Sequence, residues 1–126
     1  MRVVVADDNP KWLRMLASIV EAKYEVVSTA VDGKLALQSI SQVKPDVAVL
    51  DLEMPGLNGL EVTRQIMGNG QRPPVVICSA DTTPELVEAA RQAGAAGYVF
   101  KHSCTRDLLP AIEAVASGRV FFSPSV

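Results

Sequence analysis

Five short apolar segments alternate with five longer amphipathic segments along this chain of 126 residues. Several of the short segments are apolar at every position, which is typical of strands that are covered on both faces. We expect the strands at residues 2–6, 25–30, 46–50, 74–79 and 97–100. Strict alternation of strands and helices implies parallel strands joined by right-handed crossovers. The sequence therefore predicts an α/β fold of the (βα)5 type, with a doubly wound, five-stranded parallel sheet and helices on both faces.

The amphipathic segments carry recognisable start and stop signals for helices. Asn9 can cap the first helix, and Pro10 falls in its first turn, where a missing N–H is tolerated. The others are expected at about 33–42, after Asn58, from 83–84 onward, and up to Gly118. Pro110 lies within the last of these segments, and a helix accommodates it only near the first turn.

Composition narrows the class of protein. A formal net charge of −2 and a pI near 5.3 argue against a broad nucleic-acid surface, which needs a basic excess. No apolar run approaches the roughly 18 residues of a membrane span, and the charged N-terminal sequence does not resemble a signal peptide. The two cysteines are not clustered and show no metal-binding spacing. We expect one cytoplasmic domain without a membrane segment.

Four of the five predicted strands end in polar residues. Asp7 and Asp8 follow the first strand, Asp51 follows the third, Ser79 ends the fourth, and Lys101 follows the fifth. Ligands of such sheets bind beyond the carboxyl ends of the strands. Three neighbouring carboxylates repel one another unless a cation joins them, and this oxygen-only set suits Mg²⁺. The lysine and serine add a positive charge and a donor for phosphoryl oxygens.

These residues also have simpler interpretations, taken one at a time. An aspartate at a strand end is more often a turn or cap residue, a lone serine a turn hydroxyl, and a lone lysine a solvated charge. All four strand ends are polar in a complementary sense, which is much less expected by accident. We therefore interpret the set as one functional site.

The residues around these positions resemble the successive signatures of response-regulator receiver domains, in order and over essentially the whole chain. The matching segments are residues 3–8, 49–56, 78–80 and 97–101. The resemblance implies a flavodoxin-like fold. It also implies a Mg²⁺ site made of Asp7, Asp8, Asp51 and the backbone carbonyl of Glu53.

The same resemblance assigns the remaining roles. Asp51 is the expected phospho-acceptor, Ser79 and Lys101 hold the phosphoryl group, and Tyr98 is the aromatic switch position. The implied function is that of a signalling module and not an enzyme. The phosphoryl group is expected to come from a phosphohistidine on a sensor histidine kinase. The face made by the fourth helix, fifth strand and fifth helix is then expected to change, and two copies could pair through it.

The sequence after the lysine points to a subfamily. Many receivers have a proline after this lysine, whereas here His102 follows, and this pattern resembles the NarL/FixJ subfamily, as does the tail at 116–124. We therefore expect a receiver domain at 1–118. Residues 119–126 are expected to begin a linker to a helix-turn-helix DNA-binding domain outside this chain. Phe121 and Phe122 either cover a core edge or contact that linker.

Three alternatives compete with this interpretation. A haloacid-dehalogenase-type phosphatase also uses a strand-end aspartate and Mg²⁺, but it leaves Asp7 and Asp8 unexplained. A receiver-like interaction module that never takes phosphate usually lacks the acceptor, the acidic pair or the lysine. A flavodoxin-type cofactor binder needs a phosphate-binding loop after the first strand, where this chain has Asp8-Asn9-Pro10.

Trp12 either packs on the first helix or contacts a partner near the acidic residues.

Overall fold

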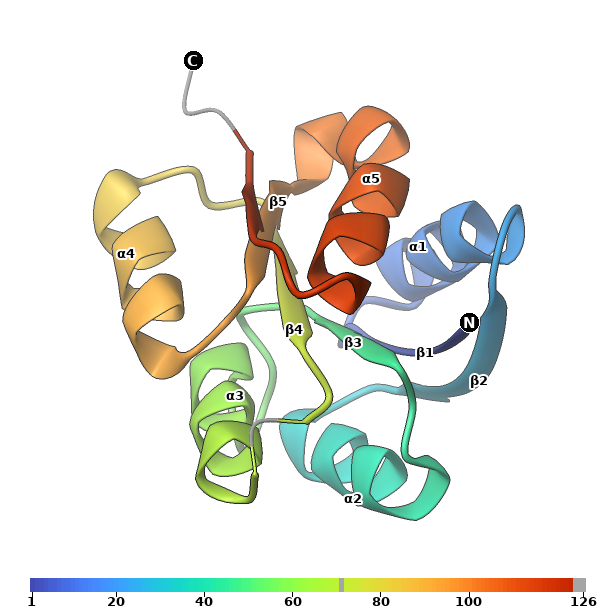
Figure 1. The fold of residues 1–126 in the computed structure, drawn as a ribbon, viewed down its shortest axis with the longest axis horizontal. Helices are drawn as coiled ribbons and strands as arrows, with labels where there is room; N and C mark the ends of the chain where they lie inside the picture. Colours follow the sequence, from blue (N-terminus) through green and yellow to red (C-terminus); the bar gives the residue numbers. More distant parts are fainter. Residues whose placement is uncertain (71, 124–126) are drawn as a thin grey trace.

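The computed structural model describes residues 1–70 and 72–123. Within them, a six-stranded, all-parallel sheet has the order β2-β1-β3-β4-β5-β6 (Figure 1). The strands are β1 (Arg2–Ala6), β2 (Glu25–Ala30), β3 (Val47–Leu50), β4 (Val75–Ser79), β5 (Gly97–Phe100) and β6 (Phe121–Phe122). The doubly wound α/β fold is confirmed. The expected number of five strands is wrong, because Phe121 and Phe122 pair with β5 in the segment where we expected a linker.

Five helices connect the strands in the described part of the chain. They are α1 (Pro10–Glu21), α2 (Gly33–Val43), α3 (Gly59–Gly68), α4 (Pro84–Ala93) and α5 (Cys104–Ala116), with a short 3-10 turn at Lys101–Ser103 before the last. The Asn9 side chain caps α1 as predicted, accepting from the backbone N–H groups of Lys11 and Trp12. None of the described helices has the length and apolar character that crossing a membrane requires.

The helices form a layer on each face of the sheet, with α1 and α5 on one side and α2, α3 and α4 on the other (Figure 1). Alternate residues of β1 show this division. Val3 and Val5 join the core under α1 and α5, while Val4 and Ala6 join the core under the other three helices. All four side chains are fully buried. The continuous apolar pattern of the strands thus follows from burial on both faces.

The strand order creates a topological switch point at the carboxyl ends of two central strands. β1 lies next to β3, and the chain leaves these two strands toward opposite faces, which is where doubly wound folds bind ligands. The backbone N–H of Asp51 donates to the carbonyl of Ala6 at 2.9 Å, which fixes the two strand ends together. Gly59, the first residue of α3, lies so close that a Cβ there would be 2.4 Å from the Asp51 carbonyl oxygen. The fold therefore packs backbone tightly around Asp51.

Pro110 lies in the interior of α5, so the expectation that a helix accommodates this proline only near its first turn is wrong. The side chain is exposed, and the helix continues past it because the buried face of α5 packs against the sheet. We expect Pro110→Ala to raise the free energy of unfolding by about 1 kcal/mol, since it restores the backbone donor facing the Arg106 carbonyl. The gain is smaller than the roughly 3 kcal/mol cost of a proline inside a helix, because the unfolded chain of the alanine variant has greater conformational entropy. Urea unfolding measures the change, and an unchanged or lower stability would contradict it.

Candidate functional site

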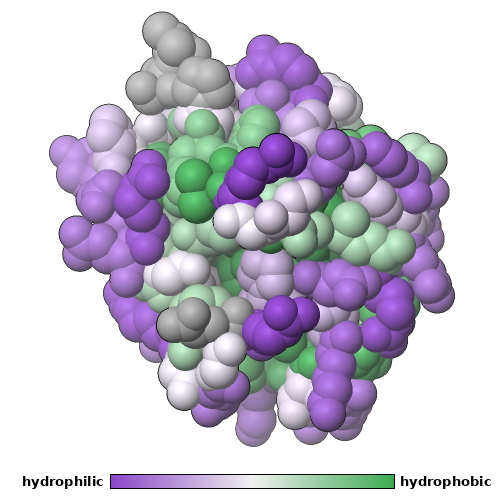
Figure 2. Space-filling view, viewed as in Figure 1, coloured by the Kyte–Doolittle hydropathy of each residue, from purple (hydrophilic) through white to green (hydrophobic). Residues whose placement is uncertain are grey.

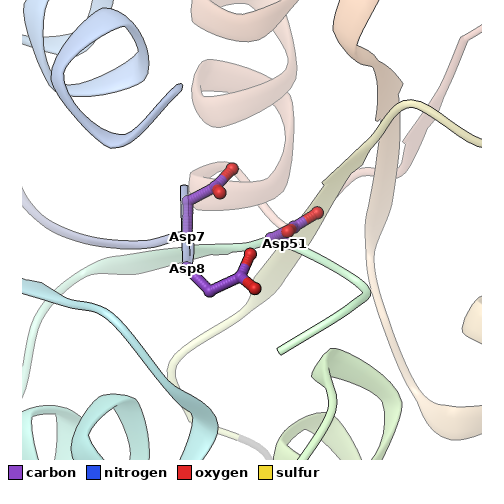
Figure 3. A group of neighbouring side chains, drawn as sticks. All are labelled: Asp7, Asp8 and Asp51. Atoms are coloured by element: carbon purple, nitrogen blue, oxygen red, sulfur yellow. The ribbon is translucent and has the colours of Figure 1, made fainter. Parts of the chain in front are cut away.

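The three carboxylates predicted to meet do lie together. Asp7 and Asp8 follow β1 and Asp51 follows β3, and one carboxylate oxygen from each lies within 4.8 Å of the others. Figure 3 shows the three side chains around one space at the ends of the two strands. Asp7 and Asp51 are buried, whereas Asp8 is exposed. The site is therefore a partly buried acidic cluster that is open to solvent on one side.

Lys101 extends into this cluster from the turn after β5. Its Nζ lies 2.8 Å from Oδ2 of Asp7 and 3.4 Å from Oδ1 of Asp51, and the side chain is only 8% exposed. Burial lowers the pKa of Lys101, but the two carboxylates outweigh this effect and raise it above its usual value. The buried ammonium group therefore stays charged and neutralises part of the cluster.

The electrostatics of Asp51 differ from those of an ordinary aspartate. Burial, followed by the charge of Asp7, raises the pKa of Asp51 to about 6, although Lys101 and the N–H of Leu52 act in the opposite direction. That N–H donates to Oδ1 at 2.9 Å. Lys101 also lies nearest to Oδ1, which leaves Oδ2 outside both contacts. Oδ2 is therefore the less engaged oxygen of this carboxylate.

The acidic cluster fits a divalent cation. Among the buried side-chain polar atoms of the described residues, Oδ2 of Asp7 is the one without a hydrogen-bond partner, although Nζ of Lys101 forms an ion pair with it at 2.8 Å. A buried carboxylate oxygen in this condition is costly unless a further positive group joins it. The donors are carboxylates, which suit Mg²⁺ and not softer metals. Glu53 is exposed just beyond Asp51, and the role of its backbone carbonyl stays a prediction.

Ser79 and Tyr98 are both linked to the loop after β4. The hydroxyl of Ser79 accepts from the backbone N–H of Asp81 at 3.0 Å. The hydroxyl of Tyr98 donates to the carbonyl of the same Asp81 at 2.8 Å. The Tyr98 residue is fully buried, so its ring points into the core and not toward solvent. The two predicted switch residues are thus connected through one residue of this loop.

The structure also shows contacts that the sequence did not reveal. The ring of Trp12 packs against the core under α1, and its centroid lies 4.9 Å from Nζ of Lys101. Packing, the simpler of the two expectations for Trp12, is therefore confirmed, with an added contact to the site. Asp107 is buried on α5 and accepts from Ser123 at 3.0 Å. The only hint of the Ser123–Asp107 contact in the sequence is that Asp107 stands among the apolar positions of α5.

This fold and site define a receiver domain, and comparison with known proteins agrees. The chain belongs to the response regulator receiver domain family, whose model matches residues 3–113. Among its relatives is the probable transcriptional regulatory protein NarL of Mycobacterium tuberculosis, 36% identical, with the match covering 100% of this chain and 59% of the relative. The uncharacterized transcriptional regulatory protein YvfU of Bacillus subtilis is 34% identical, with 64% of its length covered. The assignment to a NarL-type receiver is thus confirmed.

Solved structures show the same similarity. The signal receiver domain of M. tuberculosis NarL superposes with a TM-score of 0.90 at 36% identity, covering 94% of this chain and 97% of that one. A LuxR-family two-component response regulator from Aurantimonas has a TM-score of 0.93 at 34% identity, covering 98% and 89%. The chain spans about 60% of the length of the first two curated relatives.

A protein-glutamate methylesterase of Koribacter versatilis, 40% identical, is matched over 29% of its length. Receivers of this family therefore also occur in proteins named as enzymes.

Proposed function

We propose that Asp51 of this receiver accepts a phosphoryl group from the phosphohistidine of a sensor histidine kinase in a Mg²⁺-dependent reaction. One observation carries the proposal: the Asp51 carboxylate lies buried beside Lys101 at 3.4 Å, within a cluster of three carboxylates. A carboxylate is a competent nucleophile here because the transition state of phosphoryl transfer is loose and mainly needs alignment and charge neutralisation.

The residues of the site divide the chemical work. Oδ2 of Asp51 attacks the phosphorus atom while the bond between phosphorus and the donor imidazole nitrogen breaks, and the electron pair of that bond returns to the imidazole. The ammonium group of Lys101 balances charge that develops on the phosphoryl oxygens. The Ser79 hydroxyl is the proposed donor to one of these oxygens. Mg²⁺, held by Asp7, Asp8, Asp51 and the Glu53 carbonyl, supplies further positive charge when bound.

The acyl phosphate adds charge and acceptor oxygens at the end of β3. In this proposal the Ser79 hydroxyl leaves the Asp81 N–H for these oxygens, and Tyr98 fills the vacated space. The face made by α4, β5 and α5 changes as a result. α4 is the proposed moving element because its buried residues are Ala90 and Ala93, so few large side chains anchor it.

The output of this switch is part of the proposal. NarL and YvfU are named as transcriptional regulatory proteins, and the chain matches only part of each. We propose that residues 1–118 form the receiver and that a helix-turn-helix domain outside this chain binds DNA. The receiver itself would then be no enzyme, and pairing of two copies through the face of α4, β5 and α5 would assist the output. Residues 124–126 of the proposed linker lie outside the described residues.

Intact mass after incubation with Mg²⁺ and acetyl phosphate tests the proposal. We expect one added phosphoryl group in the wild type, no addition without Mg²⁺, and no addition in Asp51→Asn. Asp46→Asn is the matched control, because it also removes one carboxylate but lies exposed before β3, at the opposite end of the strand. An equal adduct in Asp51→Asn would refute the assignment of the acceptor. A wild type that binds Mg²⁺ but takes no phosphoryl group would favour the unphosphorylated interaction module.

A further inference from the structure

The strand β6 lies directly beside the switch residue Tyr98. β6 pairs in parallel with β5, and Phe122 is in register with Tyr98. Neighbouring strands are about 4.8 Å apart, and residues in register on parallel strands point to the same face of the sheet. Both aromatic residues accordingly belong to the core under α2, α3 and α4. Phe122 therefore lies between the Tyr98 position and the open edge of the sheet.

Ser123 makes three hydrogen bonds that help to fix this segment. The backbone N–H of Ser123 donates to the carbonyl of Tyr98 at 2.8 Å. The Ser123 hydroxyl donates to Oδ2 of Asp107 at 3.0 Å and accepts from the backbone N–H of Phe100 at 3.4 Å. Both Ser123 and Asp107 are buried. A buried charge-assisted contact of this kind favours one position of the strand over alternatives.

The helix α4 contacts β6 through Arg91. The guanidinium carbon of Arg91 lies 3.9 Å from the centroid of the Phe122 ring, within the range of a cation–π interaction. Figure 1 shows β6 between α4 and α5, next to β5. In Figure 2, apolar surface gathers in this region, between the mainly hydrophilic outer surfaces on either side. The Phe122 ring thus joins α4 to the edge of the sheet.

We infer that Phe122 is a positioning residue for Tyr98: when β6 is docked, its ring keeps the Tyr98 side chain buried with its hydroxyl on the Asp81 carbonyl. Undocking of β6 opens the space through which the Tyr98 ring leaves the core. The docking of β6 and the burial of Tyr98 are then coupled, and such coupling is reciprocal. Phosphorylation that favours the buried Tyr98 therefore also favours docked β6. This part rests on the proposed function, whereas the pairing of Phe122 in register with Tyr98 does not.

Docked β6 also changes the expected dimer face. β6 covers the edge of β5 in this structure, so a second copy approaching α4, β5 and α5 would meet β6 and not a free β5 edge.

Fluorine NMR of protein labelled with 3-fluorotyrosine tests the positioning role. The chain has two tyrosines, and Tyr24 lies just before β2, on the far edge of the sheet from β6, where it serves as an internal reference. We expect Phe122→Ala to shift the Tyr98 resonance toward the solvent-exposed position, or to split it, with the Tyr24 resonance unchanged. Phe122→Leu should retain most of the wild-type position because it keeps apolar volume. Val120→Ala is the matched control, since Val120 is 64% exposed in the same segment.

A second variant and a second measurement complete the test. Ser123→Ala leaves the Phe122 ring in place but removes two of the hydrogen bonds, so we expect a smaller shift of Tyr98 in the same direction. Tyr98 resonances at the wild-type position in both variants would overturn the inference. In the wild type, beryllofluoride with Mg²⁺ should slow hydrogen exchange of the Ser123 amide by roughly threefold or more. Unchanged exchange would overturn the coupling to phosphorylation. The fluorine arm needs no phosphate, so it separates this inference from failure of the proposed function.

Discussion

Lys101→Ala is expected to slow the phosphorylation of Asp51 by acetyl phosphate roughly 100-fold or more, while the affinity for Mg²⁺ stays equal or increases. The ammonium group lies 2.8 Å from Asp7 and 3.4 Å from Asp51, where it balances charge that develops during transfer. The same position puts it in competition with a cation for Oδ2 of Asp7. Its removal leaves three carboxylates that repel one another more strongly, and a divalent cation relieves that repulsion.

The two parts of this prediction are measured separately. Intact mass against time gives the rate of phosphorylation. The fluorescence of Trp12, the one tryptophan in the chain, reports Mg²⁺ binding because its ring lies 4.9 Å from Nζ of Lys101. Lys34→Ala removes an exposed lysine from α2 and controls for the change in net charge. A parallel loss of Mg²⁺ affinity would contradict the prediction and assign Lys101 a structural role in the cation site.

The central part of this site could be predicted from sequence because each of its residues follows a strong local signal. An apolar strand that ends abruptly in Asp7, Asp51 or Lys101 marks both the strand end and the polar group. Because the strands are parallel, their carboxyl ends then lie together at one end of the sheet. The predicted bounds of the strands at 2–6, 25–30 and 97–100 agree with the structure, and in the first and last of these the polar residue marks the strand end.

Features that depend on tertiary contacts could not be predicted in this way. β6 consists of Phe121 and Phe122, which is too short to show a periodic pattern, and β5 supplies its hydrogen bonds. Pro110 disfavours a helix locally, yet packing of the apolar face of α5 outweighs that preference. The contact between Trp12 and Lys101 joins positions far apart in sequence. In each case a neighbour from elsewhere in the chain decides the outcome.

The raised pKa of Asp51 predicts that its charge destabilises the domain when no cation is bound. Its pKa is about 6 in the folded protein, against 3.8 for an ordinary aspartate. Asp51→Asn should therefore raise the free energy of unfolding by about 2 kcal/mol near pH 8 in a chelator, allowing for partial loss of the contact with Lys101. Below about pH 4 the wild-type carboxyl is protonated in both states, so the gain should vanish. The gain should develop as pH rises from about 4 to 6 and remain constant above that range.

Urea unfolding at several pH values, with chelator and with Mg²⁺, measures this effect. A cation that binds the folded state stabilises the wild type and favours ionised Asp51, so the advantage of the asparagine variant should shrink or reverse with Mg²⁺. Asp46→Asn, with its exposed side chain, should show no such dependence on the cation. A gain that persists at low pH would exclude the charge of Asp51 as its cause. Burial of the Asp51 charge and its repulsion by Asp7 would then contribute little to the stability of the domain.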